Sequence, residues 1–304
     1  MTMKRYPRVL LGVLLLFVCL PDTAFSENSA SVPWALLPRV TALEEYRKNE
    51  LMDVLKNEPN YGKCQGTVFQ CLAAEKPDKT AVRFANFGAY IVSKGVPARS
   101  LGFLARERAK FINQETAQAF SYTGSPSLGN VKAKIIITEF AEFKCTYCVA
   151  LSPVLKKLVA DSNGKVRLVF KHFPLKNHPG TFFSSRAAQA AHKQGKFWEM
   201  YDLLYKDFGK QSMDDVLEYG RTLGMDIERF KTDLEDRKIE ELIERDKMEG
   251  VRAKVTGTPT LFINGKMYNL RHDEDFLKDL INEEAERLGL EPPYQDWVYI
   301  RQKR

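Results

Sequence analysis

Hydrophobic and polar residues follow different patterns in the two halves of this chain. Residues 27–114 carry apolar residues at helical spacing, which predicts a small all-helical N-terminal domain. We expect one helix from an N-cap at Thr41 to about Glu58, a second over 79–93 and a third from about 97 to 113. Residues 115–130 are rich in turn-forming residues, and they predict a linker to the second half.

The second half, residues 131–290, alternates short apolar runs with amphipathic stretches. The runs 135–138 and 166–170 predict buried strands, and Asn264-Gly265 between 259–263 and 266–270 predicts a β-hairpin. Helices are expected at 149–158, 182–194, 197–205, 213–223, 226–234, 239–251 and 273–288. This alternation predicts an α/β fold with a long helical stretch at about 180–252. The tail, 291–304, carries no pattern that assigns it a role.

The first 26 residues have the pattern of a secretory signal peptide. Basic residues precede an apolar run of 12, Val9–Leu20, and Ala24-Phe25-Ser26 places small residues where a signal peptidase cleaves. The run is shorter than the roughly 20 residues that a membrane-spanning helix needs. We therefore expect residues 1–26, including Cys19, to be removed and the mature protein to be periplasmic, where disulfides persist.

Composition and charge are those of a globular protein. The chain has 304 residues, 44% of them hydrophobic and 28% charged, and its net charge is +7. The basic residues do not gather with aromatic ones into a patch, so nucleic acid is not an expected partner. The four histidines, 172, 178, 192 and 272, show no metal-ligating or triad spacing, so neither a metal nor another cofactor is predicted.

Cys145 and Cys148 lie where a predicted strand gives way to a predicted helix. A helix N-terminus stabilises a thiolate, and a second cysteine three residues on can resolve a mixed disulfide. A C-x-x-C pair can also be structural, or half of a zinc site. Zinc would need two more closely spaced ligands, and Cys64 and Cys71 are separated by six residues in a different region. The position therefore favours a redox dithiol.

A second signal is Thr258-Pro259, about a hundred residues after the dithiol and directly before a predicted strand. Proline at a strand entrance, with Gly257 beside it, suggests a rigid turn with a cis peptide bond between Thr258 and Pro259. The alternative is an ordinary turn with a trans bond.

Three of these features together resemble the thioredoxin fold: the C-x-x-C after a strand, Pro153 five residues beyond Cys148, and Thr258-Pro259 before a hairpin. The helical stretch between them, with His172-Phe-Pro-Leu175 and Gln194-Gly-Lys-Phe-Trp198, is similar to that of the DsbA family of exported disulfide oxidoreductases. The resemblance covers about residues 124–290. It implies a thioredoxin fold with a helical insertion that caps the active site, preceded in this chain by the small helical domain.

The resemblance also implies roles for residues around the dithiol. Cys145 would be the nucleophile, and Cys148 the buried partner that resolves the mixed disulfide. Glu139 matches the family's buried acidic residue, which relays protons for the buried cysteine; the alternative is a solvated carboxylate at a strand end. Glu142 is expected at the surface, and Pro153 is expected to kink its helix.

Substrate contacts are expected from Thr258 and Pro259, in the loop that would face the dithiol, and from Thr146 and Tyr147 between the cysteines. The strongest oxidants of the family have Pro-His there, and the histidine helps to hold the thiolate. Tyr147 is uncharged at neutral pH, which favours a less oxidising disulfide. Tyr147 and Thr258 are closer to the isomerase and reductase relatives, so the direction of electron flow stays open.

Cys64 and Cys71 are too far apart along a helix to be bridged, so a disulfide between them would have to close a turn or an irregular segment. We expect a structural disulfide; the alternative is a second redox pair that exchanges electrons with Cys145 and Cys148. Residues 64–113 also resemble the helical domain of the cytochrome c maturation thiol proteins. That family carries C-x-x-C where this chain has six intervening residues.

These observations predict a thiol–disulfide oxidoreductase that acts on unfolded or thiol-containing exported proteins through Cys145-Thr-Tyr-Cys148. The alternatives are a disulfide isomerase or reductase, and a chaperone-like docking factor in cytochrome c maturation. An oxidase would need a membrane partner to reoxidise it. An isomerase would need a homo-oligomer, for which the N-terminal helical domain could provide the contact.

Overall fold

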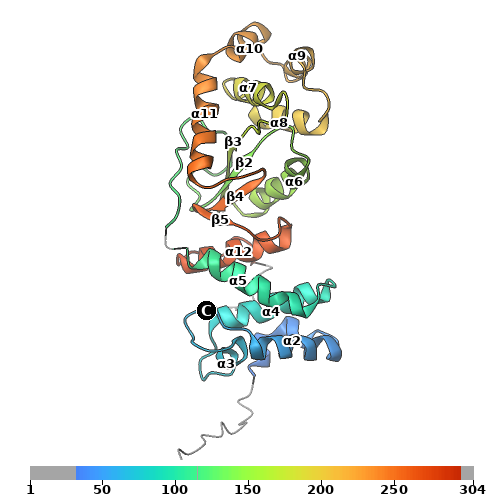
Figure 1. Cartoon of the computed structure of the whole chain (residues 1–304), viewed down its shortest axis with the longest axis vertical. Helices are drawn as coiled ribbons and strands as arrows, with labels where there is room; N and C mark the ends of the chain where they lie inside the picture. Colours follow the sequence, from blue (N-terminus) through green and yellow to red (C-terminus); the bar gives the residue numbers. More distant parts are fainter. Residues whose placement is uncertain (1–31, 115, 296–304) are drawn as a thin grey trace, which may run out of the picture.

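The structure is a computed structural model that describes residues 32–114 and 116–295 (Figure 1). The predicted signal peptide, residues 1–26, lies outside the described residues. The described chain forms an elongated molecule, with the N-terminal helices at one end and a helix-covered sheet at the other. None of the helices in these two ranges combines the length and the apolar character that crossing a membrane requires.

The N-terminal part is helical, as its apolar spacing predicts. Its α-helices are α1 (Pro38–Thr41), α2 (Glu45–Asn57), α3 (Val68–Leu72), α4 (Lys79–Ser93) and α5 (Leu101–Ile112). Helix α4 has the predicted bounds, because Asp78 caps its first N–H groups and Gly95 takes a positive φ after its end. The predicted N-cap at Thr41 is wrong. Pro38 starts the separate short helix α1, in which Thr41 is the last residue.

The sheet has five strands in the order β1-β3-β2-β4-β5. They are β1 (Ser127–Gly129), β2 (Ile135–Ala141), β3 (Val166–His172), β4 (Thr260–Ile263) and β5 (Lys266–Tyr268). Strands β2 and β3 are parallel and are joined by helix α6 (Thr146–Asp161), while the other pairs are antiparallel. Residues 127–129, which the sequence analysis placed in the linker, therefore belong to the sheet.

Helices cover both faces of the sheet, and so its central strands are buried on both sides. Alternate residues of β2 face opposite ways: Ile135 and Ile137 join a core with α6, whereas Phe140 packs against Phe173 and Phe262 on the other face. The helical insertion lies between β3 and β4. It comprises α7 (Thr181–His192), α8 (Phe197–Lys206), α9 (Met213–Thr222), α10 (Ile227–Leu234) and α11 (Arg237–Arg252). The predicted α/β fold with a helical insertion is confirmed.

The predicted β-hairpin joins β4 and β5 through Asn264 and Gly265, both at positive φ. Gly265 is required there for a second reason, since a Cβ atom would lie 2.3 Å from the backbone oxygen of Gln118. The Gln118 N–H donates to the Gly265 carbonyl at 2.8 Å, so the segment leading to the sheet is attached to the hairpin.

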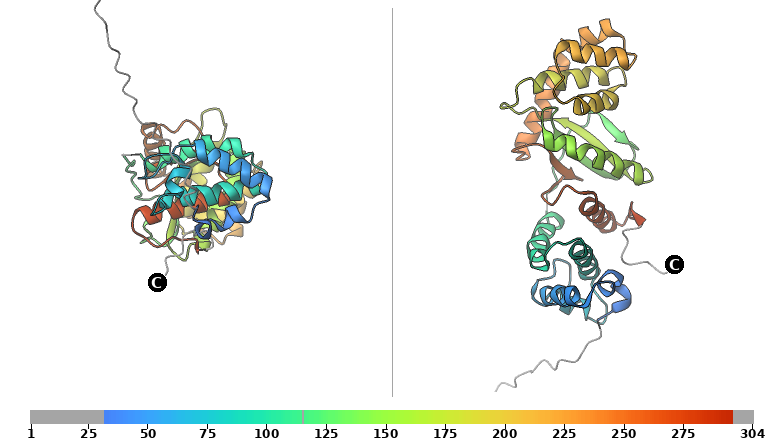
Figure 2. Two further views of the ribbon diagram at one scale, coloured as in Figure 1. Left: turned by 90° about the horizontal axis from the view of Figure 1, so that it is seen from below. Right: turned by 90° about the vertical axis from the view of Figure 1, so that its right-hand side faces the viewer.

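The last helix, α12 (Glu274–Arg287), lies between the N-terminal helices and the sheet (Figures 1 and 2). One hydrophobic cluster runs through all three layers and includes Phe84, Leu155 and Leu280. The polar side of α12 is also buried. Asp279 pairs with Arg83 at 3.0 Å and with Arg108 at 2.5 Å, and Arg108 also pairs with Glu283. The N-terminal helices therefore share a core and a buried ion-pair cluster with α12.

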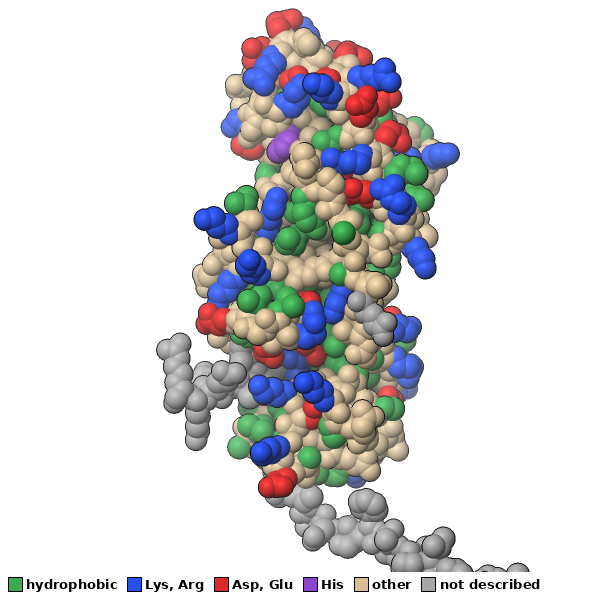
Figure 3. Space-filling model, turned by 90° about the vertical axis from the view of Figure 1, so that its left-hand side faces the viewer, with side chains coloured by type: hydrophobic (Ala, Val, Ile, Leu, Met, Phe, Trp, Pro, Cys, Tyr) green, Lys and Arg blue, Asp and Glu red, His purple; other side chains and the backbone are tan. Residues whose placement is uncertain are grey.

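The surface charges are distributed along the molecule. On the face shown in Figure 3, Lys and Arg side chains extend from the N-terminal helices to the helical insertion, with acidic side chains among them. Side chains of both signs are therefore mixed on this face.

Candidate active site

Cys145 is the N-cap residue of α6, at the point where the loop after β2 turns into the helix. Its sulfur accepts a hydrogen bond from the Cys148 N–H at 3.4 Å. The side chain of Cys148, then that of Thr258, and the backbone N–H groups of Cys148 and Tyr147 lower the pKa of Cys145 to about 6, against the effect of burial. Cys145 is therefore largely a thiolate at neutral pH.

Cys148 lies one turn into α6 and is completely buried, whereas 4% of Cys145 is exposed. Burial, the hydrogen bond to Cys145 and the charge of Glu139 raise the pKa of Cys148 far above its usual range. Both cysteines are free thiols in the structure. The two cysteines thus differ strongly in pKa. Cys145 is a nucleophilic thiolate at the helix start, and the buried Cys148 is a protonated thiol.

The Thr258–Pro259 peptide bond is cis, which confirms the turn suggested by the sequence. The Thr258 carbonyl oxygen lies 3.2 Å from the Cys145 sulfur, and both residues of the loop are partly exposed. Strand pairing explains this proximity, because β4 follows the loop and pairs with β2, which leads into the dithiol. The sheet therefore brings together two motifs that are far apart in the sequence.

Glu139 is fully buried on β2, between Phe170 of β3 and Leu261 of β4. Burial first, and then the charge of Cys145, raise its pKa to about 8. Neither carboxylate oxygen has a hydrogen-bond partner among the residues that the structure describes. The alternative of a solvated carboxylate at the strand end is wrong.

Thr146 and Tyr147, the first two residues of α6, are exposed, and Tyr147 is 76% exposed. They flank Cys145 on the solvent side, opposite the buried Cys148. Pro153 lies within α6, as expected.

Glu142 is a correction to the sequence analysis, which placed it at the surface. It is fully buried; His178 Nδ1 lies 2.5 Å from one carboxylate oxygen, and the Thr181 hydroxyl donates to the other. These contacts attach the start of the helical insertion to the loop that carries the dithiol. No local pattern around Glu142 indicates this, because its partners follow 36 and 39 residues later.

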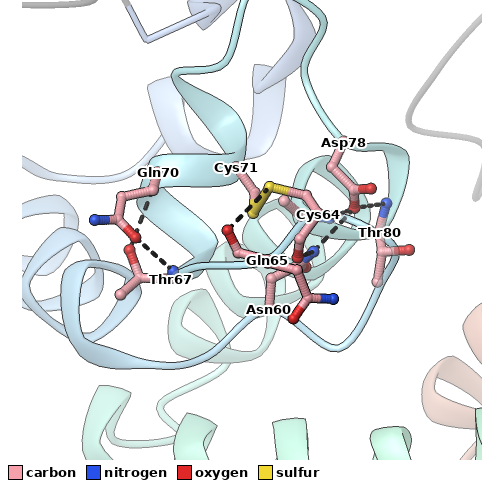
Figure 4. Close-up of a disulfide and its surroundings, with 9 residues drawn as sticks. Asn60, Cys64, Gln65, Thr67, Gln70, Cys71, Asp78 and Thr80 are labelled. Atoms are coloured by element: carbon pink, nitrogen blue, oxygen red, sulfur yellow. Dashed lines mark hydrogen bonds between the residues drawn. A yellow bond between two sulfur atoms is a disulfide. The ribbon is translucent and has the colours of Figure 1, made fainter.

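Cys64 and Cys71 form a disulfide with Cα atoms 5.8 Å apart (Figure 4). Cys64 lies in the loop before α3, and Cys71 is a buried residue of α3. Asn60 donates to the Cys64 carbonyl at 3.2 Å and to Asp78 at 3.3 Å, so the loop is also fixed to the N-cap of α4. Helices α12, α5 and α4 lie between α3 and the sheet that α6 packs beside (Figure 1), so the disulfide and the dithiol do not meet within one chain.

Across residues 32–114 and 116–295, no group of three or more His, Cys, Asp and Glu side chains could hold a metal ion. The residues that the fold brings together at the start of α6 are two cysteines, a buried acid and a proline loop.

Comparisons with known proteins agree with this arrangement. The model of the family described as Thioredoxin matches residues 121–283, which is more than half of the chain. Over 142 residues the chain is 37% identical to the Na(+)/H(+) antiporter NhaA 3 of Salinispora tropica, a match that covers 46% of this chain but only 22% of the antiporter. The chain thus corresponds to about a fifth of that protein's length.

A second relative matches over most of its length. The probable disulfide bond formation protein D of Bacillus cereus is 31% identical over 183 residues, covering 56% of this chain and 83% of that protein. Among solved structures, a thioredoxin-like oxidoreductase from Silicibacter pomeroyi DSS-3 matches with a TM-score of 0.50 and 26% identity, covering 59% of this chain and 98% of that one. By its sheet, its dithiol and these matches, the chain belongs to the thioredoxin family.

Proposed function

We propose that this chain is a thiol–disulfide oxidoreductase that acts on exported proteins through Cys145 and Cys148. The observation that supports this most directly is the difference in pKa and in burial between the two thiols. Cys145 has a pKa of about 6 at a helix N-terminus, while Cys148 is buried and protonated. The related disulfide bond formation protein D carries the same kind of activity in its name.

The exchange takes place in two steps. The Cys145 thiolate attacks a substrate disulfide, forms a mixed disulfide and releases one substrate thiolate. Cys148 then transfers its proton to Glu139, and its thiolate attacks the Cys145 sulfur. The bond between Cys145 and the substrate breaks, the second substrate thiolate leaves, and a Cys145–Cys148 disulfide remains. Oxidation of a substrate dithiol is the same sequence in reverse.

Substrate binding is assigned to the exposed residues that surround Cys145. Thr258 and Pro259 are partly exposed, with the Thr258 carbonyl oxygen beside the Cys145 sulfur, and Thr146 and Tyr147 are exposed at the helix start. Such a site suits an extended segment of an unfolded or thiol-containing chain, because an extended peptide can align its backbone with that of the loop.

Whether the protein oxidises or reduces its substrates depends on how strongly its structure stabilises the Cys145 thiolate. The Cys145 pKa of about 6 lies between the values of about 7 for thioredoxin and about 3.5 for DsbA. A more stable thiolate makes the disulfide more oxidising, so we place this protein between these two extremes. A reduction potential near about −120 mV would indicate an oxidase, and one of about −200 mV or below an isomerase or reductase.

The remaining parts of the proposal concern location and partners. Export to the periplasm rests on the pattern of residues 1–26. A membrane redox protein would reset the dithiol if the protein works as an oxidase. A homo-oligomer through the N-terminal helices is a further proposal. It is best measured by light scattering of the full mature chain, since these helices share a core with α12.

The decisive test is Cys145→Ser, which should abolish both insulin reduction and oxidative refolding of a reduced client. Cys148→Ser should instead trap the client in a mixed disulfide with Cys145, and this provides the matched control. Turnover that survives Cys145→Ser would overturn the proposal. Client binding that persists after both thiols are alkylated, without turnover in the untreated protein, would favour a docking factor in cytochrome c maturation.

A further inference from the structure

The position of the Cys145 sulfur depends on a short loop. Residues 142–145 join the end of β2 to the start of α6, so the course of their backbone determines where this sulfur lies. The sulfur accepts a hydrogen bond from the Cys148 N–H at 3.4 Å, and hydrogen bonds weaken steeply as their geometry worsens. A shift of the loop would therefore weaken a contact that stabilises the thiolate.

The first residue of this loop, Glu142, is attached to the helical insertion by its side chain. It is fully buried, with His178 Nδ1 2.5 Å from one carboxylate oxygen and the Thr181 hydroxyl donating to the other. Thr181 is the first residue of α7, and His178 lies just before this helix. A buried carboxylate that lost these partners would keep the full cost of its desolvation, so the loop and the start of α7 are held together.

The second residue of the loop, Phe143, is attached by its backbone. Its carbonyl oxygen accepts a hydrogen bond from Nε2 of Gln211 at 2.9 Å. Gln211 is buried between α8 and α9, where the same nitrogen donates to the Leu204 carbonyl at 2.9 Å and its side-chain oxygen accepts from Ser184 at 2.6 Å. The Gln211 amide therefore joins the loop to α8 and α7 at once.

The Phe143 ring is enclosed as well. It stacks on Phe170 of β3, with centroids 5.4 Å apart, and packs edge-on against Tyr201 of α8, with centroids 5.9 Å apart. Side chain, backbone and ring thus fix the two residues that lie ahead of Lys144 and Cys145, and the contacts of Glu142 and Gln211 come from the helical insertion.

We propose that Glu142 and Gln211 are positioning residues, which fix the backbone before Cys145 to the helical insertion and so hold its sulfur in the geometry that disulfide exchange needs. This inference rests on the proposed function. Neither residue exchanges a bond or a proton with the substrate. The insertion thereby acts on the reaction through the loop that it holds, since a small displacement of a reacting atom is costly.

The test compares two uncharged replacements of Glu142. Glu142→Leu removes both bonds to the insertion. Glu142→Gln keeps an oxygen that accepts from Thr181 and an N–H that can donate to His178 Nδ1. The pH midpoint of Cys145 alkylation by iodoacetamide, in a Cys64→Ser/Cys71→Ser background, should rise by about one unit in Glu142→Leu, toward that of a free cysteine. Glu142→Gln should stay close to the parent.

This pair separates position from charge. Removing a negative charge near a thiolate lowers the pKa of the thiol, so a purely electrostatic role predicts a fall of the midpoint in both variants. Gln211→Leu changes no charge and removes the bond to the Phe143 carbonyl, so its midpoint should rise as in Glu142→Leu. Asp279→Asn, which alters a buried acid on α12, is the control for destabilisation alone and should leave the midpoint unchanged.

The equilibrium with glutathione provides a second readout. At pH 8 the equilibrium constant of Glu142→Leu should move about tenfold toward the Cys145–Cys148 disulfide, because the reduced form has lost about one pKa unit of thiolate stabilisation. Glu142→Gln should again resemble the parent. A role confined to stability would change neither this constant nor the alkylation midpoint of the folded protein.

Unchanged midpoints in folded Glu142→Leu and Gln211→Leu, or equal downward shifts in the two Glu142 variants, would overturn the positioning role alone. If Glu142→Leu does not fold, Thr181→Val and Thr181→Ser give the same comparison, because only serine keeps the hydroxyl that donates to Glu142. A parent protein that forms no mixed disulfide with glutathione disulfide would instead overturn the proposed function.

Discussion

The carbonyl oxygen of Thr258 lies 3.2 Å from the sulfur of Cys145, although 113 residues separate them in the chain. The sheet enforces this proximity, since β4 follows Thr258-Pro259 and pairs with β2, which leads into Cys145. The group that would receive substrate and the group that would attack it are therefore fixed by the same pair of strands.

The rate at which iodoacetamide alkylates Cys145 should rise with pH around a midpoint near 6 and level off above it. The thiolate is the reactive form, and the pKa of Cys145 is lowered to about 6. Mass spectrometry of quenched samples in a Cys64→Ser/Cys71→Ser background measures this. Cys148 should stay unmodified throughout, and a midpoint near that of a free cysteine would contradict the assigned stabilisation.

Thr258→Val should raise the pKa of Cys145, because the Thr258 side chain is among the groups that lower it. Thiolate absorbance followed against pH reports the change directly. Thr256→Val, at an exposed position in the same loop, is the control and should leave the titration unchanged. An unchanged titration in Thr258→Val would show that the backbone and Cys148 hold the thiolate without it.

Glu139→Gln should stabilise the reduced protein at pH 8 but change it little at pH 4.5. The folded-state pKa of Glu139 is raised to about 8, so the parent's stability is fully present below the unfolded pKa and is lost as pH rises toward 8. The shift corresponds to about 3–5 kcal/mol in the free energy of unfolding. Urea unfolding at both pH values measures it, with the exposed Glu244→Gln as control. Equal stability of parent and variant at pH 8 would refute the raised pKa.

Asp279→Asn should destabilise the protein by about 3–5 kcal/mol, because it leaves Arg83 and Arg108 buried without one of their charged partners. Denaturant unfolding measures the loss. Glu286→Gln, at a partly exposed partner of Arg83, should cost much less. Disulfide exchange by the folded fraction should be unaffected, since α12 does not contribute to the dithiol site. A small loss of stability in Asp279→Asn would mean that Arg83 and Arg108 do not depend on Asp279 for charge compensation.

Replacing both Cys64 and Cys71 by serine should lower the free energy of unfolding by about 2–3 kcal/mol in the chain-entropy model. Turnover by folded protein should not change, because Cys71 lies on α3, among the N-terminal helices, whereas Cys145 is the N-cap of α6, beside the sheet. Insulin reduction below the melting transition is the readout. A large loss of turnover would favour the second redox pair over the structural disulfide.

Much of the sheet and its helices could be predicted from local pattern. Asp78 caps α4 and Asp273 caps α12, close to the helix starts that the sequence predicts. Asn264-Gly265 forms the predicted hairpin turn. Cys145 and Cys148 could be identified because they lie between a predicted strand and a predicted helix. Thr258-Pro259 could be identified because it directly precedes a predicted strand.

The features that could not be predicted from the sequence depend on partners far away in the chain. Asp279 has the polar character of a solvent-facing helix residue, but it is buried against Arg83 and Arg108, which lie 196 and 171 residues away. Strand β1 has three residues, too few for a period-two pattern to be recognised. Glu142 has the polar character of a surface residue, but it is buried against His178 and Thr181, which lie 36 and 39 residues away.

The position of α12 has a consequence for how this chain can be divided. Cut near residue 115, it would yield two pieces with opposite charges on the surfaces that now meet. The N-terminal piece would present Arg83 and Arg108, and the C-terminal piece Asp279, Glu283 and Glu286. Each piece would also expose half of a common hydrophobic core. The two segments are therefore complementary fragments of one folding unit. Helix α12, the last helix of the C-terminal segment, depends on the N-terminal helices to cover its buried acidic side.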